Sequence, residues 1–342
     1  MGDTSRHLTS FKVENFKRFE SFEMDNLGQF NLIVGDNNVG KTSVLEALLY
    51  NEQDWFFINN LFLALDFRKI KGGFFYRDLD LYCNKNQSLD QIIYAINYEV
   101  VFVGGEKSSY QLIFDKKDQN ITLKGLPSVL NKFNLFSQVG INYNMNLPLI
   151  PFYKGHDRDL TNFFSKEILP SRTKRRKMIS SLKILIPDIE EIQLSSPDPN
   201  EFGYLIVSQS KVDATIPLAL FGDGVLKLFR ILIEILNNKG KRLMIDEVDA
   251  GIHFSHFKQF WKIILSEAKE NEVQLFMTTH NEECIKYFKE ALEDELPTLQ
   301  NDARSITLVE NSKTKKVNAY TYTFEQLEAN IDIGNEIRGG GR

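Results

Sequence analysis

The chain has 342 residues, of which 42% are hydrophobic and 25% are charged, with a formal net charge of −5 at pH 7. This composition is ordinary for a globular protein and excludes a disordered chain, a collagen-like repeat and a strongly basic DNA-coating protein, although it leaves room for a local basic patch. No apolar stretch reaches the roughly 18–20 residues of a membrane-spanning helix, and Cys83 and Cys284 form no CxxC pair, so we expect a cytoplasmic protein without structural zinc.

The first fifty residues are predicted to form strands, a glycine-rich loop and a helix. Between residues 11 and 22, phenylalanine and valine alternate with polar residues, as in strands with one buried face. Residues 30–34 are a short apolar run that ends at a glycine, and residues 42–50 have helical composition and spacing. Between them, Gly35-Asp36-Asn37-Asn38-Val39-Gly40-Lys41-Thr42 fits the phosphate-loop pattern GxxxxGK[ST] at every fixed position.

The phosphate-loop pattern has a chemical reason. Its glycines allow the loop to wrap closely around phosphates with N–H groups pointing inward, and the next helix directs its positive end at the same anion. Lys41 is expected to reach the β- and γ-phosphates of a nucleotide, and the Thr42 hydroxyl to bind Mg²⁺. The alternative is a chance match in a turn, but the buried strand before the loop and the helix after it favour the phosphate loop.

The middle of the chain gives weaker signals. A Phe-rich stretch, Trp55–Phe75, is either the core of an insertion or a partner interface, and strands are predicted at Tyr98–Val103, Ser109–Phe114, Leu182–Pro187 and Tyr204–Ser208. No heptad pattern occurs, so we expect no coiled-coil arm. The densest basic cluster is either a solvated helix face or a contact to a DNA backbone or an acidic partner. It comprises Arg172, Lys174, Arg175, Arg176 and Lys177.

After residue 215, strands and helices alternate, which predicts a parallel sheet covered on both faces. The predicted helices are Val225–Leu236, Phe254–Ala268 and Asn281–Leu292, and the predicted buried strands are Arg242–Ile245 and Val273–Met277. A hairpin, Arg304–Leu308 with Ala319–Phe324, and a frayed tail from Asn330 are predicted to complete the chain.

Acidic and polar residues follow these buried strands. Asp246 is expected to hold Mg²⁺ and Glu247 to act as the general base that polarises the attacking water, although two acids after a strand are by themselves most often a solvated turn. His280 follows the next strand, where a γ-phosphate sensor would lie, and its alternative is a structural histidine. Gly222-Asp223-Gly224 is either a turn with a helix cap or a set of N–H groups presented to a phosphate held by another subunit.

Together these motifs resemble the ABC-type ATPases of the RecF, SMC and OLD branch. The segment Val13–Phe19 is similar to the opening of that branch, and the phosphate loop, Ile245–Glu247, Ala250–His253 and Thr278–Cys284 are similar to small OLD-like AAA ATPases of bacterial anti-phage defence systems. Pro217–Gly224 stands at the degenerate signature motif of that group. The separation of Lys41 from Asp246 requires a large insertion.

The resemblance implies an α/β fold: an ABC-type P-loop ATPase head with a β-rich subdomain, a parallel sheet flanked by helices, and a mixed α/β insertion. We expect an N-terminal ATPase lobe over 1–75, an insertion or lid region over 76–215, a C-terminal lobe over 216–330 and a tail over 331–342. ATP contacts are implied for the phosphate loop, Lys17, Arg18, Ser43, Gly222, Asp223 and Gly224, and catalytic roles for Lys41, Glu247 and His280. Mg²⁺ contacts are implied for Thr42 and Asp246.

Departures from the family pattern also matter. LSGGQ is absent, His253 stands where many relatives have an aspartate, and the lid-loop glutamine is Gln53, Gln87 or Gln91. No Toprim nuclease domain follows the ATPase core, so we expect a separately encoded, nuclease-like effector.

Three functions remain open from the sequence. The first is an ATP-joined homodimer that serves as the sensor or scaffold of a defence system. The second is a RecF-like DNA-binding ATPase of repair or recombination, and the third is a nucleotide-gated scaffold that does not hydrolyse ATP.

Overall fold

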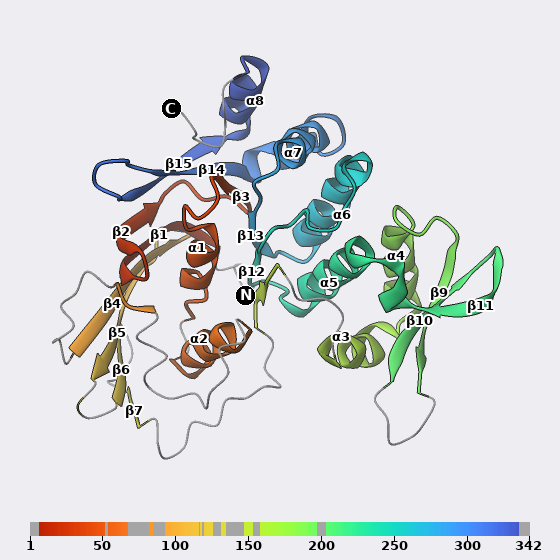
Figure 1. Ribbon diagram of the computed structural model, residues 1–342, viewed down its shortest axis with the longest axis horizontal. Helices are drawn as coiled ribbons and strands as arrows, with labels where there is room; N and C mark the ends of the chain where they lie inside the picture. The colour runs from red at the N-terminus through yellow and green to blue at the C-terminus, as the bar shows by residue number, and fades with distance from the viewer. Residues whose placement is uncertain are drawn as a thin grey trace.

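The computed structural model describes residues 7–51, 54–67, 82–84, 93–115, 117, 120–125, 131–134, 147–152, 158–196 and 203–334. Two six-stranded sheets and one three-stranded sheet organise these residues (Figure 1). The predicted α/β class is confirmed by this architecture. The boundaries predicted at residues 75, 215 and 330 stay a prediction.

The first six-stranded sheet is antiparallel, with the order β2-β1-β4-β5-β6-β7. Its strands are β1 (Leu8–Phe16), β2 (Phe19–Met24), β4 (Ile93–Phe102), β5 (Lys107–Asp115), β6 (Asn120–Gly125) and β7 (Asn131–Asn134). In β1, Phe11, Val13 and Phe16 are buried, and their partly exposed neighbours explain the alternating pattern in the sequence. Strands from the predicted insertion region therefore extend the N-terminal sheet, since β4 pairs with β1.

The second six-stranded sheet has the order β15-β14-β3-β13-β12-β8 and is parallel except for β15. Its strands are β3 (Phe30–Gly35), β8 (Leu149–Ile150), β12 (Arg242–Ile245), β13 (Gln274–Thr278), β14 (Ala303–Glu310) and β15 (Val317–Thr323). Because neighbouring parallel strands end at the same edge, β3, β12 and β13 deliver the phosphate loop, the two acids and His280 to one edge.

Alternate residues of this central sheet face two separate hydrophobic cores. Met244 and Phe276 belong to the core that contains α1 (Lys41–Ala47), α2 (Asp54–Phe67) and the antiparallel sheet. Leu243 and Leu275 belong to the other core. That core packs the sheet against α5 (Asp223–Asn237), α6 (Phe257–Glu270) and α7 (Glu282–Asp294). The expectation of a parallel sheet covered on both faces is confirmed.

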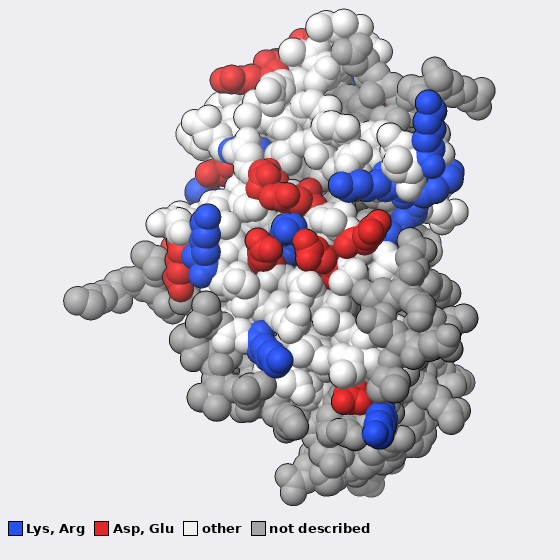
Figure 2. All heavy atoms as spheres, turned by 90° about the vertical axis from the view of Figure 1, so that its left-hand side faces the viewer, with Lys and Arg blue, Asp and Glu red and all other residues white. Residues whose placement is uncertain are grey.

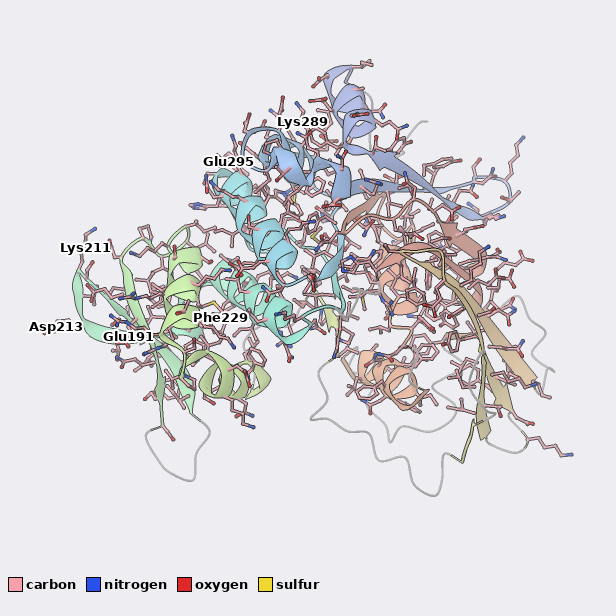
Figure 3. The ribbon with its side chains drawn as sticks, turned by 180° about the vertical axis from the view of Figure 1, so that it is seen from behind. Glu191, Lys211, Asp213, Phe229, Lys289 and Glu295 are labelled. Carbon is pink, nitrogen blue, oxygen red and sulfur yellow. The ribbon has the colours of Figure 1, made fainter. Side chains whose placement is uncertain are left out.

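A smaller layer packs beyond α5. It contains α3 (Arg158–Phe163), a π-helical turn (Phe164–Ile168), α4 (Arg172–Leu182), and the antiparallel strands β9 (Ile189–Ser195), β10 (Tyr204–Gln209) and β11 (Val212–Pro217). Figure 3 places Glu191, Lys211 and Asp213 in this layer and Phe229 on α5. The ring of Phe229 lies 5.9 Å from that of Phe164. The predicted strand Leu182–Pro187 is wrong, because Leu182 ends α4 and a turn follows.

The chain closes with a hairpin and a helix. The predicted hairpin is confirmed as β14 and β15, and α8 (Phe324–Asp332) follows directly. Thr323 and Gln326 form a capping box, which satisfies N–H groups at the start of α8. The predicted tail from Asn330 is therefore wrong for residues 330–332. No helix in the described segments is long and apolar enough to cross a membrane.

Candidate nucleotide site

The phosphate loop lies between the end of β3 and the start of α1. Gly40 has φ 113° and caps α1 without a side-chain hydrogen bond. This positive φ favours glycine, and a Cβ atom there would also crowd the Arg18 Cδ, at 2.9 Å, and the Phe19 Cζ, at 3.1 Å. The first-turn N–H groups of Lys41, Thr42 and Ser43 have no acceptor inside the helix, which suits them to an anion.

Lys41 is almost buried within this loop, with 7% of its surface exposed. Its Nζ donates hydrogen bonds to the carbonyl oxygens of Gly35, at 2.8 Å, and Asp36, at 3.0 Å. Burial lowers the pKa of Lys41, and the nearby carboxylates of Glu247, Asp246 and Asp36 oppose this effect. The Lys41 ammonium is thus hydrogen-bonded to the same loop that is predicted to surround the phosphates.

The structure brings Thr42 and Asp246 together although they lie 204 residues apart in sequence. The Thr42 Oγ1 is 3.1 Å from one carboxylate oxygen of Asp246, and the Thr278 Oγ1 donates to the other at 2.7 Å. A hydroxyl and a carboxylate are hard oxygen ligands, and Mg²⁺ often takes only one or two protein carboxylates and keeps several waters. The pair fits such an ion, even though no group of three His, Cys, Asp or Glu converges in the described segments.

Glu247 and His280 contact each other directly, which the sequence did not predict. The His280 Nδ1 lies 2.7 Å from the Glu247 Oε2, where it can donate to the carboxylate and fix its direction. Glu247 is in the left-handed region with φ 46°, and its N–H donates to the Thr278 Oγ1 at 2.9 Å. The paired ends of β12 and β13 therefore place a candidate base beside a candidate phosphate sensor.

Several polar residues around the acids were not predicted from the sequence. The Thr279 Oγ1 donates to the Asp249 carboxylate at 2.7 Å, next to the Thr278 contacts. Lys227 reaches the main chain of Asp246 from α5. The only sequence signal for Lys227 was a charged residue within the mostly apolar predicted helix Val225–Leu236, which also contains Arg230 and Glu234.

The segment predicted as a signature motif packs on the loop after β12. A 3-10 turn (Leu218–Phe221) leads to Gly222, which has φ 92° and caps α5 without a side-chain hydrogen bond. A Cβ atom on Gly224 would lie 2.3 Å from the carbonyl oxygen of Gly251. His253 caps the next short turn, and its ring lies 4.3 Å from that of Phe254, at the protein surface.

Gly224→Ala is expected to lower the free energy of unfolding by about 1–3 kcal/mol, because the added methyl group overlaps the Gly251 carbonyl. The loop that follows the two acids must then move, so ATP turnover should fall as well. Thermal or denaturant unfolding measures the first effect and phosphate release the second. Unchanged stability would contradict the close approach of α5 to this loop.

Lys17 and Arg18 lie on the turn between β1 and β2, but they point to different partners. Lys17 pairs with Glu46 of α1, and its ammonium lies 4.9 Å from the centre of the Tyr82 ring. Arg18 donates to the carbonyl oxygen of Asn38 in the phosphate loop and pairs with Glu310. The structure thus brings Arg18 to the loop mouth and places the Lys17 ammonium against α1.

A cavity of about 470 Å³ lies beside the phosphate loop. Arg18 and Glu310 line it, together with Asp36, Asn37, Asn38, Val39, Leu308 and Val309. Because this cavity adjoins the phosphate loop, it is suited to hold the base and ribose of a nucleotide.

Lysine, arginine, aspartate and glutamate side chains intermingle on the face of the molecule formed by the N-terminal strands and the terminal hairpin (Figure 2).

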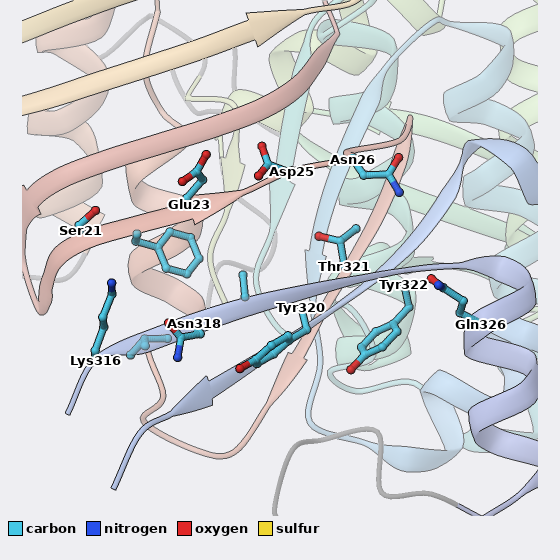
Figure 4. A pocket seen from close by; sticks show the side chains of 13 residues that line it. Ser21, Glu23, Asp25, Asn26, Lys316, Asn318, Tyr320, Thr321, Tyr322 and Gln326 are labelled. Atoms are coloured by element: carbon cyan, nitrogen blue, oxygen red, sulfur yellow. The ribbon is translucent and has the colours of Figure 1, made fainter. Parts of the chain in front are cut away.

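A second cavity, of about 550 Å³, lies between the edge strands β2 and β15. Glu23 and Asp25 line one side of it, and Tyr320 and Tyr322 line the other (Figure 4). None of the predicted site residues is among those that line this cavity. The groove is therefore separate from the phosphate loop.

The predicted basic cluster lies on α4, beside the three-stranded sheet. Lys174 and Arg175 lie 3.6 Å from Glu167 and Glu191, respectively. Lys177 lies 3.0 Å from Glu267 and also pairs with Glu270. Three of its five cations thus have acidic neighbours, which weakens the local positive potential.

Other predictions fall partly or wholly outside the described residues. Gln53, Gln87 and Gln91 lie outside them, so the lid-loop glutamine stays a prediction. Within the Phe-rich stretch, residues 57–65 of α2 are buried, which favours the core interpretation there.

Solved structures with this fold include heads of SMC proteins. The chain superposes on the Smc head domain of Pyrococcus furiosus bound to the C-terminal domain of ScpA with a TM-score of 0.58 and 10% identity, covering 96% of this chain and 99% of that one. For an Smc head bound to the C-winged helix domain of ScpA, the TM-score is 0.57 at 12% identity, with coverage of 94% and 99%. The fold is that of an ABC-type P-loop ATPase head.

Family models match most of the chain. One described as "AAA ATPase domain" matches residues 7–150, and one described as "AAA domain, putative AbiEii toxin, Type IV TA system" matches residues 98–285. Because the second match covers more than half of the 342 residues, the chain belongs to that family of AAA domains. Membership supports nucleotide binding and ATPase activity.

Two curated relatives are informative. The chain is 24% identical over 328 residues to an ATP/GTP phosphatase of Helicobacter pylori, with 84% of this chain and 89% of that protein covered. A segment of 42 residues is 38% identical to the DNA replication and repair protein RecF of Exiguobacterium sp., which is 12% of this chain and 11% of RecF. These likenesses agree with an ABC-type ATPase of the RecF and SMC branch.

Proposed function

We propose that the chain is a cytoplasmic, Mg²⁺-dependent ATPase that hydrolyses ATP to ADP and phosphate. The observation that carries this proposal is the convergence of Lys41 and Thr42 with Asp246 and Glu247 at one sheet edge. Thr42 and Asp246 would hold Mg²⁺, which when bound neutralises charge on the phosphate oxygens. The family match and the phosphatase relative support the same reaction class.

Each side chain of the site has a separate role in the proposed hydrolysis. Lys41 binds the terminal phosphates from within the loop, and Arg18 adds a second cation at the loop mouth. Glu247 accepts the proton of the attacking water, while His280 holds the Glu247 carboxylate in position and lies next to the expected γ-phosphate. These roles are assigned to the nucleotide complex on the basis of the contacts that the same residues make in the structure.

We further propose that ATP joins two copies of the chain. Gly222, Asp223 and Gly224 start α5, where the helix has no side-chain cap, and they would complete the phosphate site of the opposite copy. The likeness to Smc heads supports this arrangement at the level of the fold. Hydrolysis would then open the dimer.

The biological role that we favour is a sensor or scaffold subunit of a bacterial anti-phage defence system, which controls a separately encoded, nuclease-like effector. The resemblance to small OLD-like ATPases supports it, and the family description, which names a toxin–antitoxin system, agrees with such a setting. Co-purification from the native operon, with mass measurement with and without ATP, would report the partner and the stoichiometry together.

The enzymatic part has a direct test. Purified protein should release phosphate from ATP with Mg²⁺ and lose this activity when EDTA removes the ion, while its mass doubles with an unhydrolysable ATP analogue. ATP binding without phosphate release would favour the nucleotide-gated scaffold instead. A constant mass would contradict the ATP-joined dimer.

A RecF-like DNA-binding ATPase is the second candidate, favoured by the RecF segment and by the cations on α4. For that function, DNA should stimulate phosphate release, and stimulation should fall steeply with salt, because cations that bind DNA displace counterions. Stimulation should disappear when the cations between residues 172 and 177 are replaced by glutamine. Turnover that does not respond to DNA at low salt would contradict this candidate.

A further inference from the structure

A buried lysine connects the start of α5 to the two acids. Lys227 is 4% exposed, and its Nζ donates a hydrogen bond to the main-chain carbonyl oxygen of Asp246 at 2.8 Å. Burying an ammonium group is unfavourable unless hydrogen bonds and opposite charges compensate. A lysine in this place therefore calls for a reason beyond packing.

The surroundings of Lys227 supply that compensation. Burial lowers its pKa to about 8, while Asp246, Asp249 and Glu247 favour the charged form. Arg230, one turn further along α5, is also buried but pairs with Glu234 of the same helix at 2.7 Å. Lys227 is thus bonded to the segment that carries the acids, and the Arg230–Glu234 ion pair lies within α5.

The bond fixes one particular peptide group. The carbonyl of Asp246 and the N–H of Glu247 belong to the same peptide plane, and the N–H donates to the Thr278 Oγ1 at 2.9 Å. Lys227 from α5 and Thr278 from β13 thus hold the two sides of this plane. Glu247 follows it in a left-handed conformation, φ 46°, which is unfavourable for a non-glycine residue and needs such support.

The other side of the connection is the start of α5. Gly224, one turn before Lys227, contacts the loop after the acids so closely that a Cβ would lie 2.3 Å from the Gly251 carbonyl. A shift of α5 beyond the reach of the Lys227 side chain would either move the Asp246–Glu247 peptide or break this hydrogen bond. The geometry of α5 and the direction of the Glu247 side chain are therefore mechanically linked.

We infer that Lys227 is a positioning residue, which holds the Asp246–Glu247 peptide so that Glu247 points at the attacking water only when the start of α5 is correctly seated. This inference rests on the proposed hydrolysis and on the proposed contact of Gly222–Gly224 with a second copy's nucleotide. Contact of Gly222–Gly224 with the second copy's nucleotide would then affect the direction of Glu247 through the Lys227 side chain.

The test is Lys227→Met, which keeps the length of the side chain and removes the hydrogen-bond donor. We expect an unchanged Kd for ATP and a kcat reduced by about 10- to 100-fold, as for a displaced catalytic group. Lys227→Arg keeps a cationic donor and should retain more turnover than Lys227→Met. The matched control is the double variant Arg230→Leu/Glu234→Leu, which removes a buried ion pair from the same helix and should change stability but not kcat.

Each outcome has a distinct meaning. Wild-type kcat in Lys227→Met, or equal losses in the Met and Arg variants, would overturn the inference and leave the proposed hydrolysis intact. If Lys227→Met does not fold, Lys227→Leu, which also lacks a hydrogen-bond donor, gives the same comparison: a lower kcat at unchanged Kd supports the inference, and an unchanged kcat overturns it. A wild-type chain that binds ATP without releasing phosphate would remove the proposed function, and with it this role.

Discussion

Glu247→Gln is expected to bind ATP as the wild type does and to release phosphate at least about 100-fold more slowly, because the amide cannot accept the proton of the attacking water. The amide has nearly the same shape as the carboxylate and can still accept a hydrogen bond from His280 at the Oε position, which is 2.7 Å away in the wild type. The phosphate loop and the Thr42–Asp246 pair are untouched. The loss should therefore fall on kcat and leave the Kd for ATP unchanged.

The same variant should accumulate the ATP-joined dimer, since opening would require hydrolysis. Size-exclusion chromatography with light scattering should find twice the monomer mass with ATP and Mg²⁺, and single-turnover phosphate release gives the rate. Glu272→Gln is a matched control, because Glu272 also has a positive φ, 53°, but precedes β13 at the opposite edge of the sheet. Wild-type turnover in Glu247→Gln would disprove the assignment of the base.

Lys41→Ala is expected to abolish measurable nucleotide retention. Hydrogen bonds to charged groups contribute about 1.5–3 kcal/mol each, so the loss of contacts to two phosphates should raise the Kd for ATP by about 100-fold or more. Lys41 is also nearly buried, and desolvation is the main cause of its lowered pKa. Its removal should therefore leave the melting temperature unchanged or slightly raised.

Binding of a fluorescent ATP analogue, together with thermal unfolding, separates these two effects. Lys12→Ala is the control, since Lys12 lies on β1 and pairs with Glu14 and Glu99 at the surface. A Lys41→Ala protein that is folded and binds ATP with wild-type affinity would rule out the phosphate-loop assignment.

The local chemistry could be predicted because single segments carry it. The phosphate loop needs glycines and a lysine at fixed positions, and Asp246 follows a strand of apolar residues, so both patterns are visible without the fold. The direct contact of Glu247 with His280 was not predictable, since it depends on the register that pairs Ile245 with Met277. The hydrogen bond from Lys227 likewise depends on how α5 docks, which no local pattern encodes.

Two segments differ from their predicted structure for physical reasons. Leu182–Pro187 contains apolar residues because the end of α4 and the turn after it are partly buried. A short apolar run of this kind can form either a strand or a partly buried turn, and the sequence pattern does not distinguish the two. The helix α2 was not predicted because its stretch is apolar on nearly all sides, with residues 57–65 buried, so no helical period stands out. The strands β4 and β5 were predicted, but their pairing with the N-terminal sheet was not.

The strand that delivers the acids, β12, is only four residues long, and two of its adjacent residues, Met244 and Ile245, belong to different hydrophobic cores. Because this one strand packs in both cores, a substitution that shifts either core would also shift the strand and the acids that follow it. A partner protein that moves one core relative to the other would therefore change the positions of Asp246 and Glu247 without contacting the nucleotide.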